Sequence, residues 1–164
     1  MKTFILLSAI PGSGKSTWAK NYQREHPNTF IVGSDDIRQN HFGSIKNFQH
    51  EKEVWQIFLH DINEYGEQDG VTVIADATNL TNHYRNYYRE MTPIFDKHIL
   101  VCFNIPFEIC LKQNKMRDPE KVVEDYAMKK LMDEYEAPDE KTIASYDEYI
   151  EVGPDFIANI LKNK

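Results

Sequence analysis

The sequence predicts an α/β fold built on a mostly parallel five-stranded sheet with helices on both faces. Short apolar runs alternate with segments of helical periodicity along all 164 residues. This alternation is typical of parallel sheets whose crossover connections are helices. Polar residues follow several of the apolar runs, which is where open α/β sheets bind their ligands, at the carboxyl ends of the strands.

The apolar runs predict five strands. These strands cover residues 4–10, 29–33, 71–75, 99–103 and 146–152. The first run is continuously apolar, as expected of a strand that is covered on both faces. It resembles a signal peptide only superficially, because it is short and no small-residue cleavage site follows it.

Helices are predicted in the intervening segments. They cover residues 16–26, a single turn at 37–40, 48–68, 82–91, 107–115, 119 to about 134, and the segment after Gly153-Pro154. In the third of these, apolar residues recur at helical spacing from Val54 to Ile62. Residues 41–47 are predicted to be a loop, and Pro119 is expected to open its helix.

A glycine-rich loop joins the first predicted strand to the first predicted helix. It reads Pro11-Gly12-Ser13-Gly14-Lys15-Ser16-Thr17, and strand, loop and helix in this order are the context of a phosphate-binding P-loop. The glycines allow a tight turn whose N–H groups converge on an anion, and the helix dipole adds positive potential there. The position where the full pattern carries a first glycine holds Ala9. The alternative is a plain turn.

The loop implies ATP and Mg²⁺ as ligands. We expect Gly12, Ser13, Gly14 and Thr17 to cradle the phosphates. Lys15 would supply positive charge to the β- and γ-phosphates, and the Ser16 hydroxyl would bind Mg²⁺. A dinucleotide-binding reading fails because Thr17 stands where that motif needs its third glycine.

Asp35, Asp36 and Arg38 follow the second predicted strand. A spacing of three residues on a helical turn places Asp35 and Arg38 on one face. Asp35 is then a candidate general base and Arg38 a candidate clamp for an anionic acceptor. The alternative is that an aspartate caps the helix and Arg38 forms an ordinary ion pair.

Two further groups of polar residues complete the predicted site. Asp76 ends the third strand and is a candidate ligand of Mg²⁺, or of the waters around it, close to the bound substrate. Asn79, nearby, is expected to be a turn or helix cap. Gln113 and Arg117 lie in a helical lid predicted at about 113–122, where Arg117 can neutralise charge on the transferred phosphoryl group.

Several other features carry less functional information. Lys112 and Lys115 are expected to be exposed, and Tyr84, Tyr87 and Tyr88 to be core and surface residues, although base stacking stays open. The six histidines show no metal-ligand spacing.

Composition restricts the class of protein. A net charge of −7 argues against a protein that coats duplex nucleic acid, but not against one that grips a strand end in a locally basic pocket. The two cysteines, Cys102 and Cys110, indicate a reducing compartment. We expect a cytoplasmic protein, in the host cytoplasm if it is phage-encoded, with no membrane segment.

With these residues in place, the chain resembles the kinase domain of bacteriophage and bacterial polynucleotide 5′-hydroxyl kinases. The similar segments are residues 11–19, the Asp-Asp-x-Arg-Gln of residues 35–39 and the Asp-Ala-Thr-Asn-Leu of residues 76–80. The resemblance implies one P-loop kinase domain over residues 1–164. We expect no phosphatase domain in residues 1–164, since they contain no Asp-x-Asp-Gly-Thr stretch.

The resemblance also implies roles for individual residues. Asp35 would be the general base, and Arg38 would bind the phosphate 3′ of the accepting nucleotide. Lys15 and Ser16 would hold the donor phosphates and Mg²⁺. Arg117 matches the second of two lid arginines, whereas Gln113 stands where the first is expected.

The sequence leaves three functions open. The first is ATP-dependent phosphorylation of a 5′-hydroxyl polynucleotide end, DNA or RNA. The second is a P-loop kinase of a small metabolite, a nucleoside or a seryl-tRNA-like acceptor. The third is a nucleotide-binding module without turnover. Arg38 favours the first over the second, because a neutral acceptor offers it no phosphate, and Asp35 argues against the third.

Overall fold

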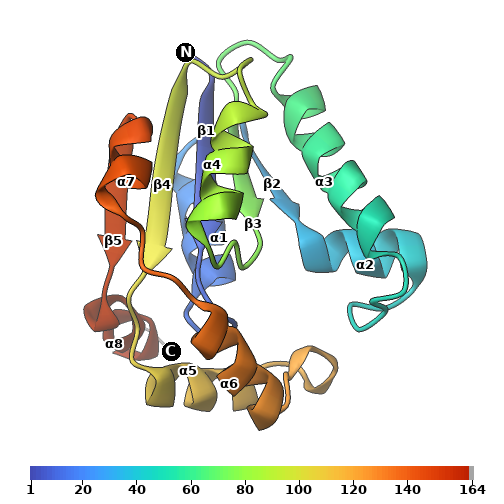
Figure 1. The fold of residues 1–164 in the computed structure, drawn as a ribbon, viewed down its shortest axis with the longest axis vertical. Coiled ribbons are helices and arrows are strands. Elements are labelled where there is room, and N and C mark those ends of the chain that lie inside the picture. The colour runs from blue at the N-terminus through green and yellow to red at the C-terminus, as the bar shows by residue number, and fades with distance from the viewer. Residues whose placement is uncertain (163–164) are drawn as a thin grey trace.

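A five-stranded sheet forms the centre of the protein, with the strand order β2-β3-β1-β4-β5 (Figure 1). The computed structural model describes residues 1–162. Every neighbouring pair of strands is parallel, which confirms the predicted fold class. The strands are β1 (Thr3–Ser8), β2 (Thr29–Gly33), β3 (Thr72–Asp76), β4 (Lys97–Phe103) and β5 (Glu148–Val152).

Both faces of the sheet are buried, because successive side chains of a strand point to opposite faces. In β1, Phe4 and Leu6 belong to one apolar cluster, while Ile5 and Leu7 belong to a second. The continuous apolar run of the sequence therefore fills two cores.

Helices cover each face of the sheet (Figure 1). The first cluster includes residues of α3 (Glu51–Tyr65) and α4 (Asn82–Glu90). The second includes residues of α1 (Lys15–Glu25), α5 (Phe107–Lys115), α6 (Asp125–Glu134) and α8 (Pro154–Lys162). Helices α5 and α6 lie beyond the carboxyl ends of the strands, which is the edge where the sequence places the site (Figure 1).

Helix α2 (Ser34–Phe42) is longer than the predicted single turn. It begins directly after β2, so that Asp35 and Asp36 lie in its first turn, where carboxylates favour the positive end of the helix dipole. Gly43, with φ of +84°, ends the helix in the left-handed conformation. The predicted loop therefore loses its first two residues to α2, and helix α3 begins only at Glu51.

The predicted helix from Pro119 to about residue 134 is wrong in its first half. Pro119–Lys121 form only a short 3₁₀ turn, η1, and α6 begins at Asp125. Val122 is extended. The buried Asn114 side chain donates a hydrogen bond to the Val123 carbonyl and accepts one from the Val123 amide. A polar side chain from another element thus replaces the hydrogen bonds that a continuous helix would make.

The sequence interpretation also missed helix α7 (Glu140–Ser145). Its N-cap is Asp139, whose carboxylate accepts a hydrogen bond of 2.7 Å from the Thr142 amide. An aspartate before a helix is a recognised start signal, so Pro138-Asp139-Glu140 contained the information. None of the helices within residues 1–162 has the length and apolar character needed to cross a bilayer.

Candidate active site

The P-loop lies between β1 and α1 and packs against α5. Gly12 and Gly14 adopt φ of +82° and +94°, which L side chains rarely tolerate. A Cβ at Gly12 would collide with the Cys110 carbonyl of α5, so this close approach also requires glycine. Ala9 does not have positive φ, which explains why alanine is accepted where the full motif carries glycine.

Lys15 begins α1 and its side chain folds over the loop. Its ammonium donates hydrogen bonds of 3.1 Å to the carbonyl oxygens of Ala9 and Ile10. Burial lowers the pKa of the Lys15 amine, and the charges of Asp76 and Asp35 oppose this effect. The amine therefore sits at the mouth of the loop, where a phosphate oxygen can replace a carbonyl as its partner.

Ser16 and Asp76 meet across the loop. The Ser16 hydroxyl donates a hydrogen bond of 2.9 Å to Oδ2 of Asp76, which ends β3. Burial raises the pKa of the Asp76 carboxyl, as do Asp35 and Asp36, whereas Lys15 and Ser16 act against the rise. A hydroxyl and a carboxylate in contact, with other carboxylates around them, are hard oxygen donors that fit Mg²⁺.

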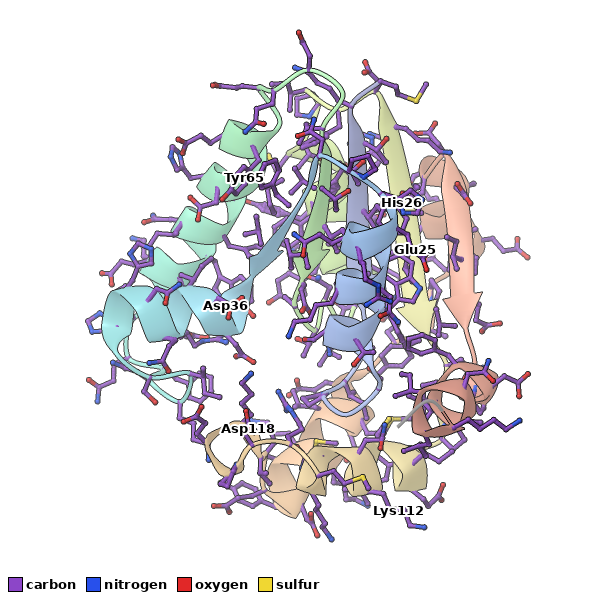
Figure 2. The ribbon with its side chains drawn as sticks, turned by 180° about the vertical axis from the view of Figure 1, so that it is seen from behind. Glu25, His26, Asp36, Tyr65, Lys112 and Asp118 are labelled. Atoms are coloured by element: carbon purple, nitrogen blue, oxygen red, sulfur yellow. The ribbon has the colours of Figure 1, made fainter. Side chains whose placement is uncertain are left out.

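Asp35 is contacted by two cations from different elements. Arg38 Nη1 lies 3.0 Å from its Oδ1, as the spacing on one helical face predicted. Arg117 Nη2, from the segment that follows α5, lies 3.9 Å from its Oδ2. Figure 2 shows α2, marked by Asp36, and the lid segment, marked by Asp118, on the same side of the molecule.

Arg38 also has a second carboxylate partner that sequence reasoning missed. Glu51, the first residue of α3, accepts from Nη2 at 2.6 Å and from Nε at 3.0 Å. Arg38 is only 6% exposed, and Phe48 and Trp55 present their rings to the guanidinium at 5.0 and 5.5 Å from their centroids. The ion-pair alternative thus describes Arg38 in this structure. No local signal links Glu51 to Arg38, because α2 and α3 meet only through the tertiary fold.

The segment predicted as a lid, residues 113–122, carries the remaining predicted residues. Gln113 is half-buried, and no hydrogen bond of its side chain is found within the described residues. Its neighbour Asn114 is fully buried and binds both backbone groups of Val123, at 2.6 and 3.0 Å. Asn114 therefore closes the loop that carries Arg117. Lys115 is exposed, as expected, and lies 3.6 Å from Asp125.

Other predictions have mixed outcomes. Thr17 is exposed in the first turn of α1. Asn79 is not a helix cap: it is buried at φ of +45°, and its amide donates to the Leu7 carbonyl at 2.8 Å, which ties the end of β1 to the loop after β3. Tyr88 lies in the core, while Tyr84 and Tyr87 are exposed on α4.

The fold, the loop and the converging side chains define the class: a P-loop nucleotide-binding protein with the architecture of P-loop kinases. More particularly, a family model described as an AAA domain, AAA_33, matches residues 5–138. The chain therefore belongs to this family.

The sequence identities to individual relatives are low. The chain is 25% identical over 146 residues to the L-seryl-tRNA(Sec) kinase of Methanococcus maripaludis, a match that covers 84% of this chain and 54% of the relative. Among solved structures it is similar to a chain of the Pnkp1/Rnl/Hen1 RNA repair complex, with a TM-score of 0.72 and 23% identity over 89% of this chain and 46% of that one. Kti12 of Chaetomium thermophilum, solved with ADP-AlF3, gives a TM-score of 0.66 and 16% identity over 93% and 89%. The chain thus spans about half the length of the first two.

Proposed function

We propose that this protein is an ATP-dependent kinase that phosphorylates the 5′-hydroxyl of a polynucleotide, DNA or RNA. The observation that carries the proposal is the convergence on Asp35. Arg38 and Arg117 contact its two oxygens at 3.0 and 3.9 Å, and Lys15 and Asp76 lie close enough to perturb each other's pKa. A pure nucleotide-binding module has no need of a carboxylate held between two cations at the acceptor side of a P-loop.

In the proposed reaction, the 5′-hydroxyl oxygen attacks the γ-phosphorus of ATP. The bond from this phosphorus to the bridging β-phosphate oxygen breaks, ADP leaves, and Asp35 takes the hydroxyl proton. Lys15 and Arg117 stabilise the negative charge of the transferred group. Ser16 and Asp76 would hold Mg²⁺, which supplies further neutralisation of the phosphates when bound.

The acceptor is proposed to be a polynucleotide because of Arg38. Glu51 takes the Nε edge of its guanidinium and Asp35 takes one N–H of Nη1. A guanidinium has five N–H donors, so one on each η nitrogen is left over, and we propose that these meet the phosphate. The similarity to a chain of an RNA repair complex and to a kinase that acts on a charged tRNA supports a nucleic-acid acceptor.

We also propose the bounds of the kinase domain and of its lid. Residues 1–164 would form one kinase domain, with residues 113–122 as its lid, working in the cytoplasm. The two hydrogen bonds between the Asn114 side chain and the Val123 backbone close the loop that carries Arg117, which supports treating this segment as one unit.

The test is phosphoryl transfer from γ-labelled ATP to a panel of acceptors: 5′-hydroxyl DNA and RNA oligonucleotides, nucleosides, sugars and seryl-tRNA. Label on the oligonucleotide 5′ end supports the proposal. Label only on nucleosides or sugars would establish the small-metabolite kinase instead, and label only on seryl-tRNA would place the acceptor on an aminoacyl group. ATP binding without transfer to any acceptor would leave a binding module.

A second measurement isolates Arg38. The catalytic efficiency on a nucleoside 3′-monophosphate is divided by that on the plain nucleoside, for the wild type and for Arg38→Ala. A fork of charge-assisted hydrogen bonds contributes about 1.5–3 kcal/mol, so the ratio should fall roughly 10- to 100-fold in the variant. An unchanged ratio would leave Arg38 as a structural partner of Glu51.

A further inference from the structure

We propose that Phe48 is a stacking platform for one of the first two bases of the acceptor strand. This inference rests on the proposed function and adds a subsite to it. The α2–α3 connection, residues 43–50, carries Phe48 in a shallow, open hollow that is also lined by Ser44, Lys46, Asn47 and Gln49.

The position of Phe48 distinguishes it from an ordinary exposed apolar residue. Its side chain is 60% exposed, and single exposed aromatic residues are common on protein surfaces. Its ring, however, lies 5.0 Å from the Arg38 guanidinium, which in turn contacts Asp35 at 3.0 Å. A single guanidinium therefore separates the proposed general base from an aromatic ring that is open to solvent.

The loop that carries the ring is held in place by its own hydrogen bonds. The Asn47 amide donates to the Phe42 carbonyl at 3.0 Å, and the Asn47 side-chain oxygen accepts from the Gln49 backbone at 3.1 Å. The His50 ring stacks on Phe42 with centroids 4.4 Å apart. A ring presented on an ordered loop loses little conformational freedom on binding a flat ligand.

The chemistry of the surroundings favours a nucleobase as the occupant. The exposed Lys46 lies in the same hollow and can meet a backbone phosphate, in a chain whose net charge is −7. Aromatic rings beside basic side chains are the usual platform for single-stranded nucleic acid, because every base has a π-face. The subsite would therefore prefer unpaired 5′ ends over ends that are closed in a duplex.

The test uses the full chain and 5′-hydroxyl DNA 12-mers in which the base is removed at position 1, 2 or 6. With the intact strand, Phe48→Ala should raise the acceptor KM roughly 5- to 100-fold, the worth of one base–aromatic stack, and leave the KM for ATP unchanged. Phe48→Trp should restore binding. Met91→Ala, which removes a 45% exposed apolar side chain from the connection before β4, at the opposite edge of the sheet from the site, is the matched control and should match the wild type.

The abasic strands separate stacking from an effect through Arg38. In the wild type, removing the base at position 1 or 2 should raise the acceptor KM by about the same factor as Phe48→Ala does with the intact strand. In the Phe48→Ala variant, removing that base should raise the acceptor KM no further. Loss at position 6 should have no effect. If Phe48→Ala weakens intact and abasic strands equally, or weakens neither, the stacking proposal is overturned while the kinase assignment stands. If the wild type phosphorylates no oligonucleotide and binds none in a fluorescence titration, both proposals fail.

Discussion

The side chain of Asn114, near the end of α5, binds the backbone of Val123 and so closes the loop that carries Arg117. Its removal should loosen that loop. Asn114 is fully buried, donates to the Val123 carbonyl at 2.6 Å and accepts from the Val123 amide at 3.0 Å. Each hydrogen bond contributes about 1 kcal/mol net, and stranding a buried polar group adds about 1–3 kcal/mol. Val123 is half-buried, so water reaches its backbone in part. Asn114→Ala should therefore lower the free energy of unfolding by about 2–3 kcal/mol.

The assay is urea unfolding followed by tryptophan fluorescence, together with hydrogen exchange at the Val123 amide. Asn63→Ala is the control, because Asn63 also donates two hydrogen bonds, both of 3.2 Å, but lies on α3 and is only half-buried. The control should lose about 1 kcal/mol or less and should leave Val123 exchange unchanged. An Asn114→Ala protein with wild-type stability and wild-type exchange at Val123 would refute the reasoning.

Three further outcomes are expected. Lys15→Ala should stay folded and lose roughly 10²–10³ in transfer rate, since the proposed role of the amine, which lies against the loop carbonyls, is to neutralise the phosphates; near wild-type turnover would contradict this role. Arg117→Ala should lower the transfer rate by roughly 10³–10⁵, and Gln113→Arg should lower the KM for ATP. An Arg117→Ala protein with the wild-type rate would show that another residue neutralises the transferred phosphoryl group. Burial lowers the pKa of His98 in the folded state, so the unfolded chain binds the proton first, and the free energy of unfolding should fall as pH drops below about 6.5. His98→Gln should flatten this pH dependence in urea titrations between pH 7 and 5, and an unchanged slope would contradict it.

Local signals in the sequence predicted most of the fold. The continuous apolar run of β1 and the glycine loop after it fixed the strand, the turn and the start of α1 to within two residues. Residues 29–33 and 107–115 were predicted with their observed bounds. The segment between α5 and α6 was predicted less well, because Asn114 replaces helical hydrogen bonds with contacts to Val123, and nothing near Pro119 signals this.

Contacts within the candidate site were predictable where the residues share an element or lie at the same edge of the sheet. Asp35 and Arg38 meet because they lie three residues apart on α2, and Ser16 and Asp76 meet because parallel strands end at one edge. Glu51 and Phe48 were missed, since their approach to Arg38 depends on the angle between α2 and α3 and on the fold of the connecting loop. Such contacts have no fixed spacing in the sequence.

The central claim is that Asp35 takes the proton from the 5′-hydroxyl of a polynucleotide. Single-turnover transfer from γ-labelled ATP to a 5′-hydroxyl oligonucleotide, by the wild type and by Asp35→Asn, tests it most directly. The substitution keeps the size of the side chain, so ATP affinity should be unchanged while the transfer rate falls by roughly 10²–10⁴. Transfer by the Asp35→Asn protein within about threefold of the wild-type rate would contradict the claim, since a general base contributes at least about a hundredfold.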